Sequence, residues 1–181
     1  MAEPFPIQKE SDVITVRPAS MADLDILTDI EAASFPPEEK ATRDSFEKRL
    51  ALFADCFLIL CDDGRPIGLI DGMVTNQRTI SDDMFEDANL HNPRGEWQSV
   101  FGFCVVPDMR GKGCAPALMK AFIEKARQEG RRGLILTCKD YLIHYYEQFG
   151  YVNRGVSKSQ HGGAVWYDME LEFAECDATS H

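Results

Sequence analysis

The chain has 181 residues, of which 44% are apolar and 27% are charged. This balance is ordinary for a globular protein and excludes a collagen-like or disordered composition. Nineteen Lys and Arg against 30 Asp and Glu give a formal net charge of −11, which makes nucleic acid and anionic membranes poor partners. No stretch approaches the roughly 18 apolar residues that a membrane-spanning helix needs, and residues 1–10 lack the pattern of a signal peptide. We therefore expect one cytoplasmic domain that binds neither nucleic acid nor membrane.

The six cysteines stand singly, without a C-x-x-C pair: Cys56, Cys61, Cys104, Cys114, Cys138 and Cys176. Four of them lie in apolar runs, which favours free buried thiols in a reducing compartment. The spacing of a zinc site or of a disulfide framework is absent, so no metal is expected.

The N-terminal part of the chain predicts a strand followed by two helices. Residues 13–17 form the strand, which stops at Pro18, and Ser20 begins a helix with Asp23 as its capping-box partner. The Phe35-Pro36-Pro37 sequence breaks that helix. A second helix follows and ends near Phe53, with its apolar residues on one stripe.

A hairpin is predicted next, with strands at residues 56–61 and 66–75 joined by Asp63-Gly64. Residues 76–97 are polar and weakly patterned, and we interpret them as a long excursion with a helical turn. A long irregular segment of this kind in a compact domain is more often functional than idle.

The C-terminal part alternates strands and helices. Strands are predicted over residues 99–106, 134–138, 151–157 and 164–172, and helices over 113–130 and 142–149. The first of these helices is the clearest in the chain, because its apolar residues recur at helical spacing and Gly130 closes it. Switching between periods of 2 and 3.6 is typical of a mixed α/β domain.

The turn between residues 106 and 113 is the strongest candidate binding segment. Gly111 and Gly113 let the backbone approach a ligand, and the N-terminus of the following helix offers free N–H groups and the positive end of its dipole. Such a site suits a phosphate or pyrophosphate, although neither a P-loop nor a dinucleotide fingerprint is present. From the glycines alone, an ordinary tight turn is an equally good interpretation.

The R-x-x-G-x-A pattern of residues 110–115 resembles the acyl-CoA pyrophosphate loop of the GCN5-related N-acetyltransferases (GNAT superfamily). The order β-α-α-β-β-β-α-β-α-β-β resembles that superfamily over nearly the whole chain. Five segments are similar to non-vertebrate arylalkylamine (serotonin-type) N-acetyltransferases: residues 16–36, 62–72, 90–95, 136–151 and 166–171. The resemblance implies one α/β domain over residues 13–173, between flexible segments 1–12 and 174–181. It further implies a central mixed sheet of about seven strands, splayed after the fourth strand and flanked by about four helices.

The resemblance also implies how acetyl-CoA would bind as cosubstrate. Backbone groups of Phe103, Cys104 and Val105 would hold the pantetheine arm. The pyrophosphate would lie in a loop formed by Arg110, Gly111, Lys112, Gly113, Cys114, Ala115 and Pro116. Tyr146 matches the tyrosine that protonates the leaving thiolate, whereas Tyr145 is interpreted as a packing residue.

The acceptor site departs from the vertebrate pattern, because Ser99 and Phe101 occupy the positions of its two proton-relay histidines. A primary amine with a pKa near 10 is almost wholly protonated at pH 7, so another base is needed or the reaction uses the rare neutral amine. Glu39 and Asp71 are the candidate bases, although Glu39 could be a solvated loop charge and Asp71 a paired one. The candidate acceptor wall comprises Phe35, Pro36, Pro37, Phe101 and His161, with His91 as a further possibility.

We therefore expect an acetyl-CoA-dependent N-acetyltransferase, monomeric or homodimeric, that acetylates a small arylalkylamine or polyamine-like primary amine by direct attack in a ternary complex. Two alternatives remain open at this point: acetylation of a protein or peptide, and a non-catalytic acyl-CoA-binding sensor.

Overall fold

The computed structural model describes residues 13–174, so the expected flexible segment at 1–12 and all but the first residue of the one at 174–181 lie outside the described residues. Within that range the α-helices are Leu24–Ser34 (α1), Arg43–Phe53 (α2), Asp82–Glu86 (α3), Cys114–Gln128 (α4) and Ile143–Glu147 (α5). The strands are Ile14–Pro18 (β1), Phe57–Asp62 (β2), Arg65–Asp71 (β3), Val74–Thr75 (β4), Trp97–Val100 (β5), Gly102–Val105 (β6), Gly133–Cys138 (β7), Val152–Val156 (β8) and Tyr167–Glu172 (β9).

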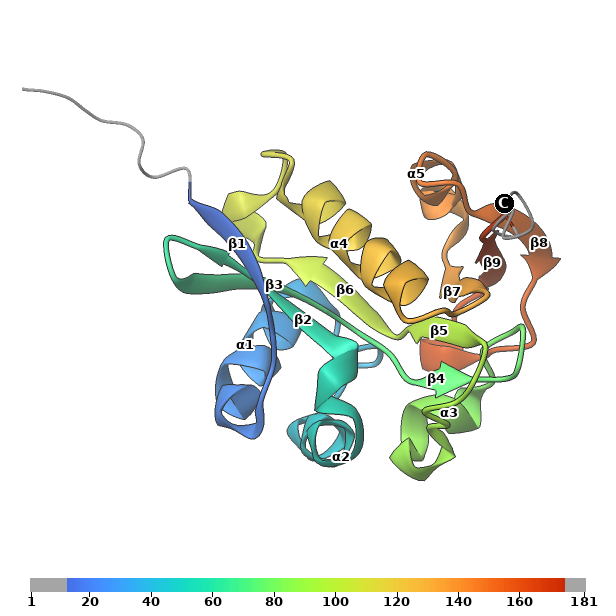
Figure 1. The fold of residues 1–181 in the computed structure, drawn as a ribbon, viewed down its shortest axis with the longest axis horizontal. Helices are drawn as coiled ribbons and strands as arrows, with labels where there is room; N and C mark the ends of the chain where they lie inside the picture. The colour runs from blue at the N-terminus through green and yellow to red at the C-terminus, as the bar shows by residue number, and fades with distance from the viewer. Residues whose placement is uncertain (1–12, 175–181) are drawn as a thin grey trace, which may run out of the picture.

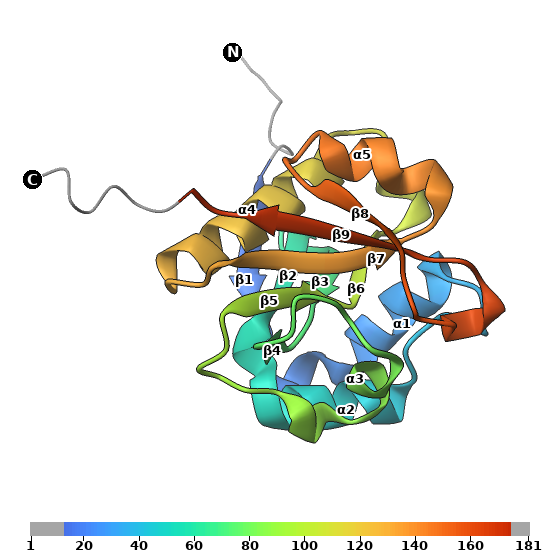
Figure 2. The ribbon, with the colours of Figure 1, turned by 90° about the vertical axis from the view of Figure 1, so that its right-hand side faces the viewer.

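The strands form two sheets that meet along the middle of the molecule (Figure 1). One sheet has the order β1-β2-β3-β6 and is antiparallel throughout. The other has the order β4-β5-β7-β9-β8 and contains the parallel pair β5–β7. Helices α1 and α2 lie on one side of the strands and α4 lies on the other (Figure 1), while Figure 2 shows β9 between β7 and β8.

Local sequence signals explain where several elements begin and end. The Ser20 backbone N–H donates to the Asp23 carboxylate at 2.9 Å, which confirms the expected capping box ahead of α1. Asp63 and Gly64 both have positive φ, at 52° and 86°, as a tight turn between β2 and β3 requires. The expected excursion over residues 76–97 contains the short helix α3.

Nine strands are present in residues 13–174 rather than about seven, because two expected strands are each divided. Residues 66–75 split into β3 and β4 at Gly72, where an added Cβ would lie 1.9 Å from the Ser99 carbonyl oxygen. Residues 99–106 split at Phe101, which separates β5 from β6. The buried Gln98 side-chain amide donates to the backbone carbonyls of Gly72 and Ser99, both at 2.8 Å. It thereby supplies these two carbonyls with the hydrogen bonds that an uninterrupted pair of strands would have given them.

The core has two parts, one on each side of the strands. Residues of α1 and α2 form one cluster with inner faces of β2 and β3, and α4 forms the other with β7 and α5. The five cysteines within residues 13–174 are buried free thiols, as expected, and Cys176 lies outside the described residues. No helix in the described part of the chain is long and apolar enough to cross a lipid bilayer.

Candidate active site

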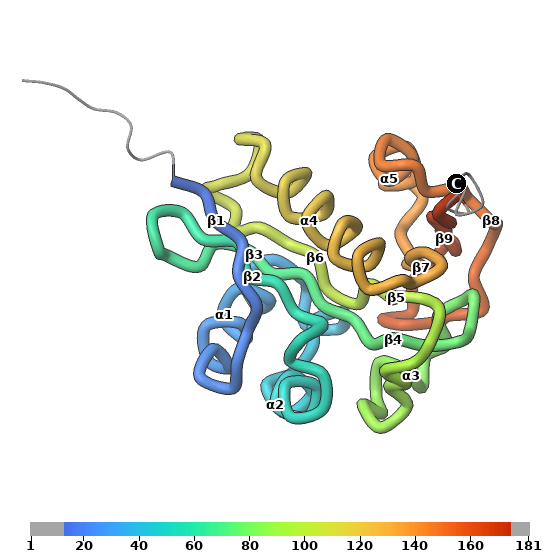
Figure 3. The backbone as a smooth tube through the Cα atoms, in the orientation of Figure 1, coloured from blue at the N-terminus to red at the C-terminus, as the bar shows by residue number. Residues whose placement is uncertain are grey.

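The loop ahead of α4 has the geometry of an anion cradle. Gly111 and Gly113 adopt φ of +78° and +80°, and a Cβ at either position would meet nothing within 4 Å. The backbone N–H groups of residues 111–114 donate to no acceptor among the described residues. The Arg110 side chain turns back to donate to the Val105 carbonyl at 3.1 Å, which ties the loop to β6. Figure 3 follows the chain from β6 through this loop into α4.

The two sheets separate directly beside this loop. Strands β5 and β7 run parallel as far as the pair Val100–Leu136. Beyond that point β6 pairs with β3 alone among the described strands, so the side of β6 that faces β7 has no strand partner. This free edge contains Phe103, Cys104 and Val105, and it can offer main-chain hydrogen bonds to an extended ligand.

A cavity of about 330 Å³ opens where the sheets separate. Its apolar and aromatic lining includes Phe35, Phe85, Val100, Phe101, Phe103, Leu136, Leu142 and Trp166. Its ionisable and polar lining includes Glu31, Glu39, Lys40, Thr42, Ser45, Arg49, Glu86, Cys138, Tyr146 and His161. The wall therefore combines aromatic surface with three carboxyl groups and two cationic side chains, Lys40 and Arg49.

Tyr146 on α5 lies in this wall, and Tyr145 lies outside it. The Tyr146 side chain is buried, with its ring centroid 6.3 Å from that of Phe103 on β6. Burial raises the pKa of Tyr146 above its usual value, so the hydroxyl stays protonated at neutral pH. That hydroxyl makes no hydrogen bond to another described residue.

Glu39 and His161 come together in the wall of the cavity. Glu39 forms an ion pair with Lys139 at 2.6 Å, and its carbonyl oxygen lies 2.9 Å from His161 Nε2. The His161 ring stacks on Phe85 with centroids 4.9 Å apart, and the Trp166 indole donates to the His161 carbonyl at 2.7 Å. The loop over 157–166 thereby covers the segment between α1 and α2.

Other expected site residues lie beside the cavity rather than in its wall. Asp71 is fully buried and forms an ion pair with Arg49 at 3.1 Å. Phe35 lines the cavity, but Pro36 and Pro37 do not; the Pro36 carbonyl instead accepts the N–H of Glu39 at 2.9 Å and shapes the turn.

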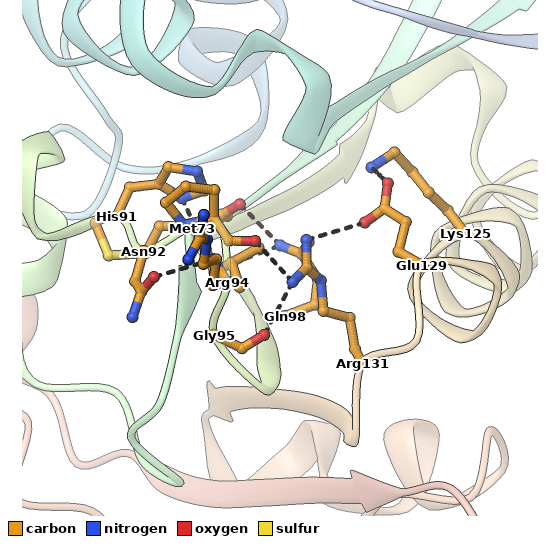
Figure 4. Close-up of polar contacts among 12 residues, drawn as sticks. Met73, His91, Asn92, Arg94, Gly95, Gln98, Lys125, Glu129 and Arg131 are labelled. Atoms are coloured by element: carbon orange, nitrogen blue, oxygen red, sulfur yellow. Dashed lines mark hydrogen bonds and ion pairs between the residues drawn. The ribbon is translucent and has the colours of Figure 1, made fainter.

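His91 lies in a separate polar cluster, so it is not part of the acceptor wall (Figure 4). Its Nδ1 accepts the Val74 N–H at 3.0 Å. In the same cluster Arg131 donates to the carbonyls of Pro93 and Gly95 at 3.0 and 2.9 Å. The segment at residues 90–95 therefore binds the turn that follows α4 through the Arg131 side chain.

Sequence reasoning missed Glu31, Arg49, Phe85 and Trp166, all of which line the cavity. Glu31 carried a detectable signal, because it lies seven residues after Leu24 and therefore on the apolar face of α1. The other three depend on contacts between distant segments.

The separation of the sheets beside a glycine-rich loop and a buried tyrosine is the arrangement that the resemblance to the GCN5-related N-acetyltransferases implies. The model of the acetyltransferase (GNAT) family matches residues 24–151, more than half of the chain. The chain belongs to this family, which makes it an acetyl-CoA-dependent N-acetyltransferase by class. No curated protein matches the chain in a sequence search.

Several solved structures share the fold at low sequence identity. The loading GNATL domain of CurA from Lyngbya majuscula is 12% identical, with a TM-score of 0.77 over 89% of this chain and 98% of that one. The ribosomal-protein-S18-alanine N-acetyltransferase from Escherichia coli is 16% identical, with a TM-score of 0.70 over 91% and 96%. The PaiA N-acetyltransferase from Thermoplasma acidophilum, solved with coenzyme A, is 14% identical, with a TM-score of 0.66 over 88% and 99%. The comparisons support the superfamily and not the narrower arylalkylamine resemblance.

Proposed function

We propose that this protein transfers the acetyl group of acetyl-CoA to a small primary amine by direct attack in a ternary complex. The observation that carries this proposal is the cavity at the separation of the two sheets, which joins Tyr146 to an aromatic and acidic wall. Its volume of about 330 Å³ matches the lower end of small-molecule sites.

The residues of the loop and of β6 fit an acyl-CoA cosubstrate. Backbone N–H groups over 111–115 would hold the pyrophosphate at the N-terminus of α4, and Pro116 lacks an N–H where none is needed. The main chain of 103–105 would bind the pantetheine arm along the free edge of β6. Cys114 contributes its backbone alone, since its side chain is buried in the core.

The chemistry needs two proton transfers. The amine nitrogen attacks the thioester carbonyl, a C–N bond forms, and the C–S bond breaks to release a thiolate. In this proposal the Tyr146 hydroxyl, which lines the cavity and stays protonated at neutral pH, donates a proton to that thiolate. Of the two protons that an ammonium nitrogen loses on becoming an amide, one ends on the CoA thiol and the other reaches solvent.

The cavity wall supports a primary amine with an aromatic or apolar body, a class that includes arylalkylamines. The rings of Phe85 and Phe101 lie 4.8 Å apart and form one apolar surface. The wall holds three carboxyl groups against the two cationic side chains of Lys40 and Arg49, and this small excess of acidic groups favours an ammonium group over an anion.

A screen of acceptors tests the proposal. Release of CoA thiol would be measured with tryptamine, phenethylamine, spermidine, a lysine peptide and a peptide with a free N-terminus. We expect turnover with the small aromatic amines. Turnover with peptides alone would favour protein acetylation, and acetyl-CoA binding without turnover of any amine would favour a sensor.

A further inference from the structure

Glu31 is a buried carboxyl group that lines the cavity, and one of its two oxygens has no hydrogen-bond partner among the described residues. It lies in the last turn of α1, and 4% of its surface is exposed. Its Oε2 accepts the Ala41 backbone N–H at 2.8 Å, whereas its Oε1 is buried and has no hydrogen-bond partner among the described residues. An unpartnered buried acceptor is costly, and an ammonium group that reached Oε1 would remove that cost.

A second unpartnered oxygen approaches the same point from β3. An added Cβ at Gly102 would lie 2.9 Å from Asp71 Oδ1 and 3.1 Å from Glu31 Oε1. The Asp71 oxygen is also buried without a partner, although the other oxygen of that carboxyl contacts Arg49. Glycine at 102 therefore leaves room for two carboxyl groups at the start of β6, next to the point where the sheets separate.

The charges around Glu31 come from every element packed against it. Asp71 on β3 opposes its ionisation, Arg49 on α2 and Lys40 after α1 favour it, and the Cys104 thiol on β6 is neutral because burial raises its pKa. Burial is the largest influence and raises the pKa of Glu31 to about 7. A group with such a pKa can both accept and release a proton near neutral pH.

We propose that Glu31 is the base of this acetyltransferase, accepting at Oε1 the proton that the amine loses before it attacks the thioester. The inference rests on the proposed function. The ammonium gives one proton to the carboxylate, which leaves a neutral amine and a carboxylic acid, and the carboxylic acid later returns the proton to solvent.

The other lining carboxylates are less suited to this role. Glu39 is held by Lys139 at 2.6 Å, and Glu86 is exposed to solvent. Of the three carboxylates that line the cavity among the described residues, Glu31 alone is buried. It supplies the function that histidines at positions 99 and 101 would have served.

The test compares Glu31→Gln with Glu39→Gln at two pH values, with kcat/KM for the amine as the measurement. Without its base the enzyme depends on the neutral fraction of an amine with a pKa near 10. We expect Glu31→Gln to lose about 100-fold or more at pH 7 and less than about 3-fold at pH 10, with acetyl-CoA affinity unchanged. For Glu39→Gln any loss should be equal at both pH values. A loss by Glu31→Gln that does not change with pH would overturn the proposal.

A measurement that does not depend on turnover separates this inference from the proposed function. In protein labelled with ¹³C at glutamate carboxyl carbons, one resonance should titrate near pH 7 and be missing from Glu31→Gln. Titration of every glutamate well below pH 6 would overturn the assignment even if the wild type acetylates amines. If the resonance titrates near 7 but no amine or peptide is turned over, the proposed function fails and the role of Glu31 as a base fails with it.

Discussion

The guanidinium of Arg49 lies 3.1 Å from the carboxylate of Asp71, and both side chains are buried, Arg49 in the cavity wall and Asp71 behind it. Arg49 also lies 4.9 Å from the centre of the Phe101 ring and donates to the Phe85 carbonyl at 3.3 Å. The Arg49 side chain on α2 therefore contacts β3, helix α3 and the residue between β5 and β6.

Replacing Asp71 with Asn should destabilise the fold strongly, because it leaves the buried Arg49 charge without its partner. We expect a loss of about 3–5 kcal/mol in the free energy of unfolding, measured by urea denaturation at pH 7. Asp25→Asn is the matched control, since it breaks an exposed Asp–Arg pair with Arg43 at 2.9 Å and should cost no more than about 0.5 kcal/mol. Equal losses in the two variants would show that burial of the pair is unimportant.

Replacing Gly113 with Asp should raise the dissociation constant of acetyl-CoA by about tenfold or more, or roughly 1.4 kcal/mol. The new carboxylate would enter the open space of the cradle and repel the pyrophosphate. Gly130 is a close match, because it has the same φ of +80° and equally open surroundings just after the C-terminal end of α4. Gly130→Asp should leave the affinity unchanged in isothermal titration, and parallel losses in both variants would point to helix distortion instead.

Replacing Tyr146 with Phe should lower kcat by roughly 10- to 1000-fold through loss of the proton donor. Acetyl-CoA affinity should change little, since one hydroxyl is removed. Tyr145 precedes it on α5 but lies outside the cavity wall, so Tyr145→Phe should be nearly silent in the same steady-state assay. The reverse order of effects would assign the donor to Tyr145.

The raised pKa of Glu31 has a consequence for stability that is opposite to its proposed benefit for activity. The group has an ordinary pKa of 4.5, and burial raises it to about 7 in the fold. Between these values the native state binds more protons than the unfolded state, so this carboxyl lowers stability as pH rises from 4.5 through 7. Glu31→Gln should therefore be more stable than wild type above pH 7, by up to about 3 kcal/mol. Thermal denaturation of both proteins at pH 5 and pH 8 would measure this, and a variant less stable at pH 8 would contradict it.

Much of the fold follows from local signals in the sequence. The Ser20–Asp23 capping box, the Asp63-Gly64 turn and the apolar stripe of α4 each act over a few residues, and the structure has all three. The division of two strands at Gly72 and Phe101 was not predicted, because it depends on a close approach between chain segments about 27 residues apart. A contact between such distant residues leaves no periodic pattern of apolar residues in the sequence around either of them.

The proposed cosubstrate loop is easier to recognise in the sequence than the proposed acceptor wall. The loop over 110–116 is contiguous, so its glycines and the helix that follows can be recognised together. The acceptor wall instead combines α1, α2, α3 and the loop over 157–166, which tertiary packing alone brings together. Glu31 was overlooked because a single acid on an apolar helix face is usually a tolerated exception.

The buried cysteines make the native chain its own reporter of unfolding. A thiol reacts as its thiolate, and that form is suppressed where burial raises the pKa, as it does for Cys56 and Cys104. Alkylation must therefore wait for the surrounding structure to open. Two further thiols are also buried: Cys61 lies in the core on the α1 and α2 side, and Cys114, the first residue of α4, lies in the core on the α4 side. Their relative alkylation rates, resolved by peptide mass, would reveal which half of the molecule opens first without any introduced label.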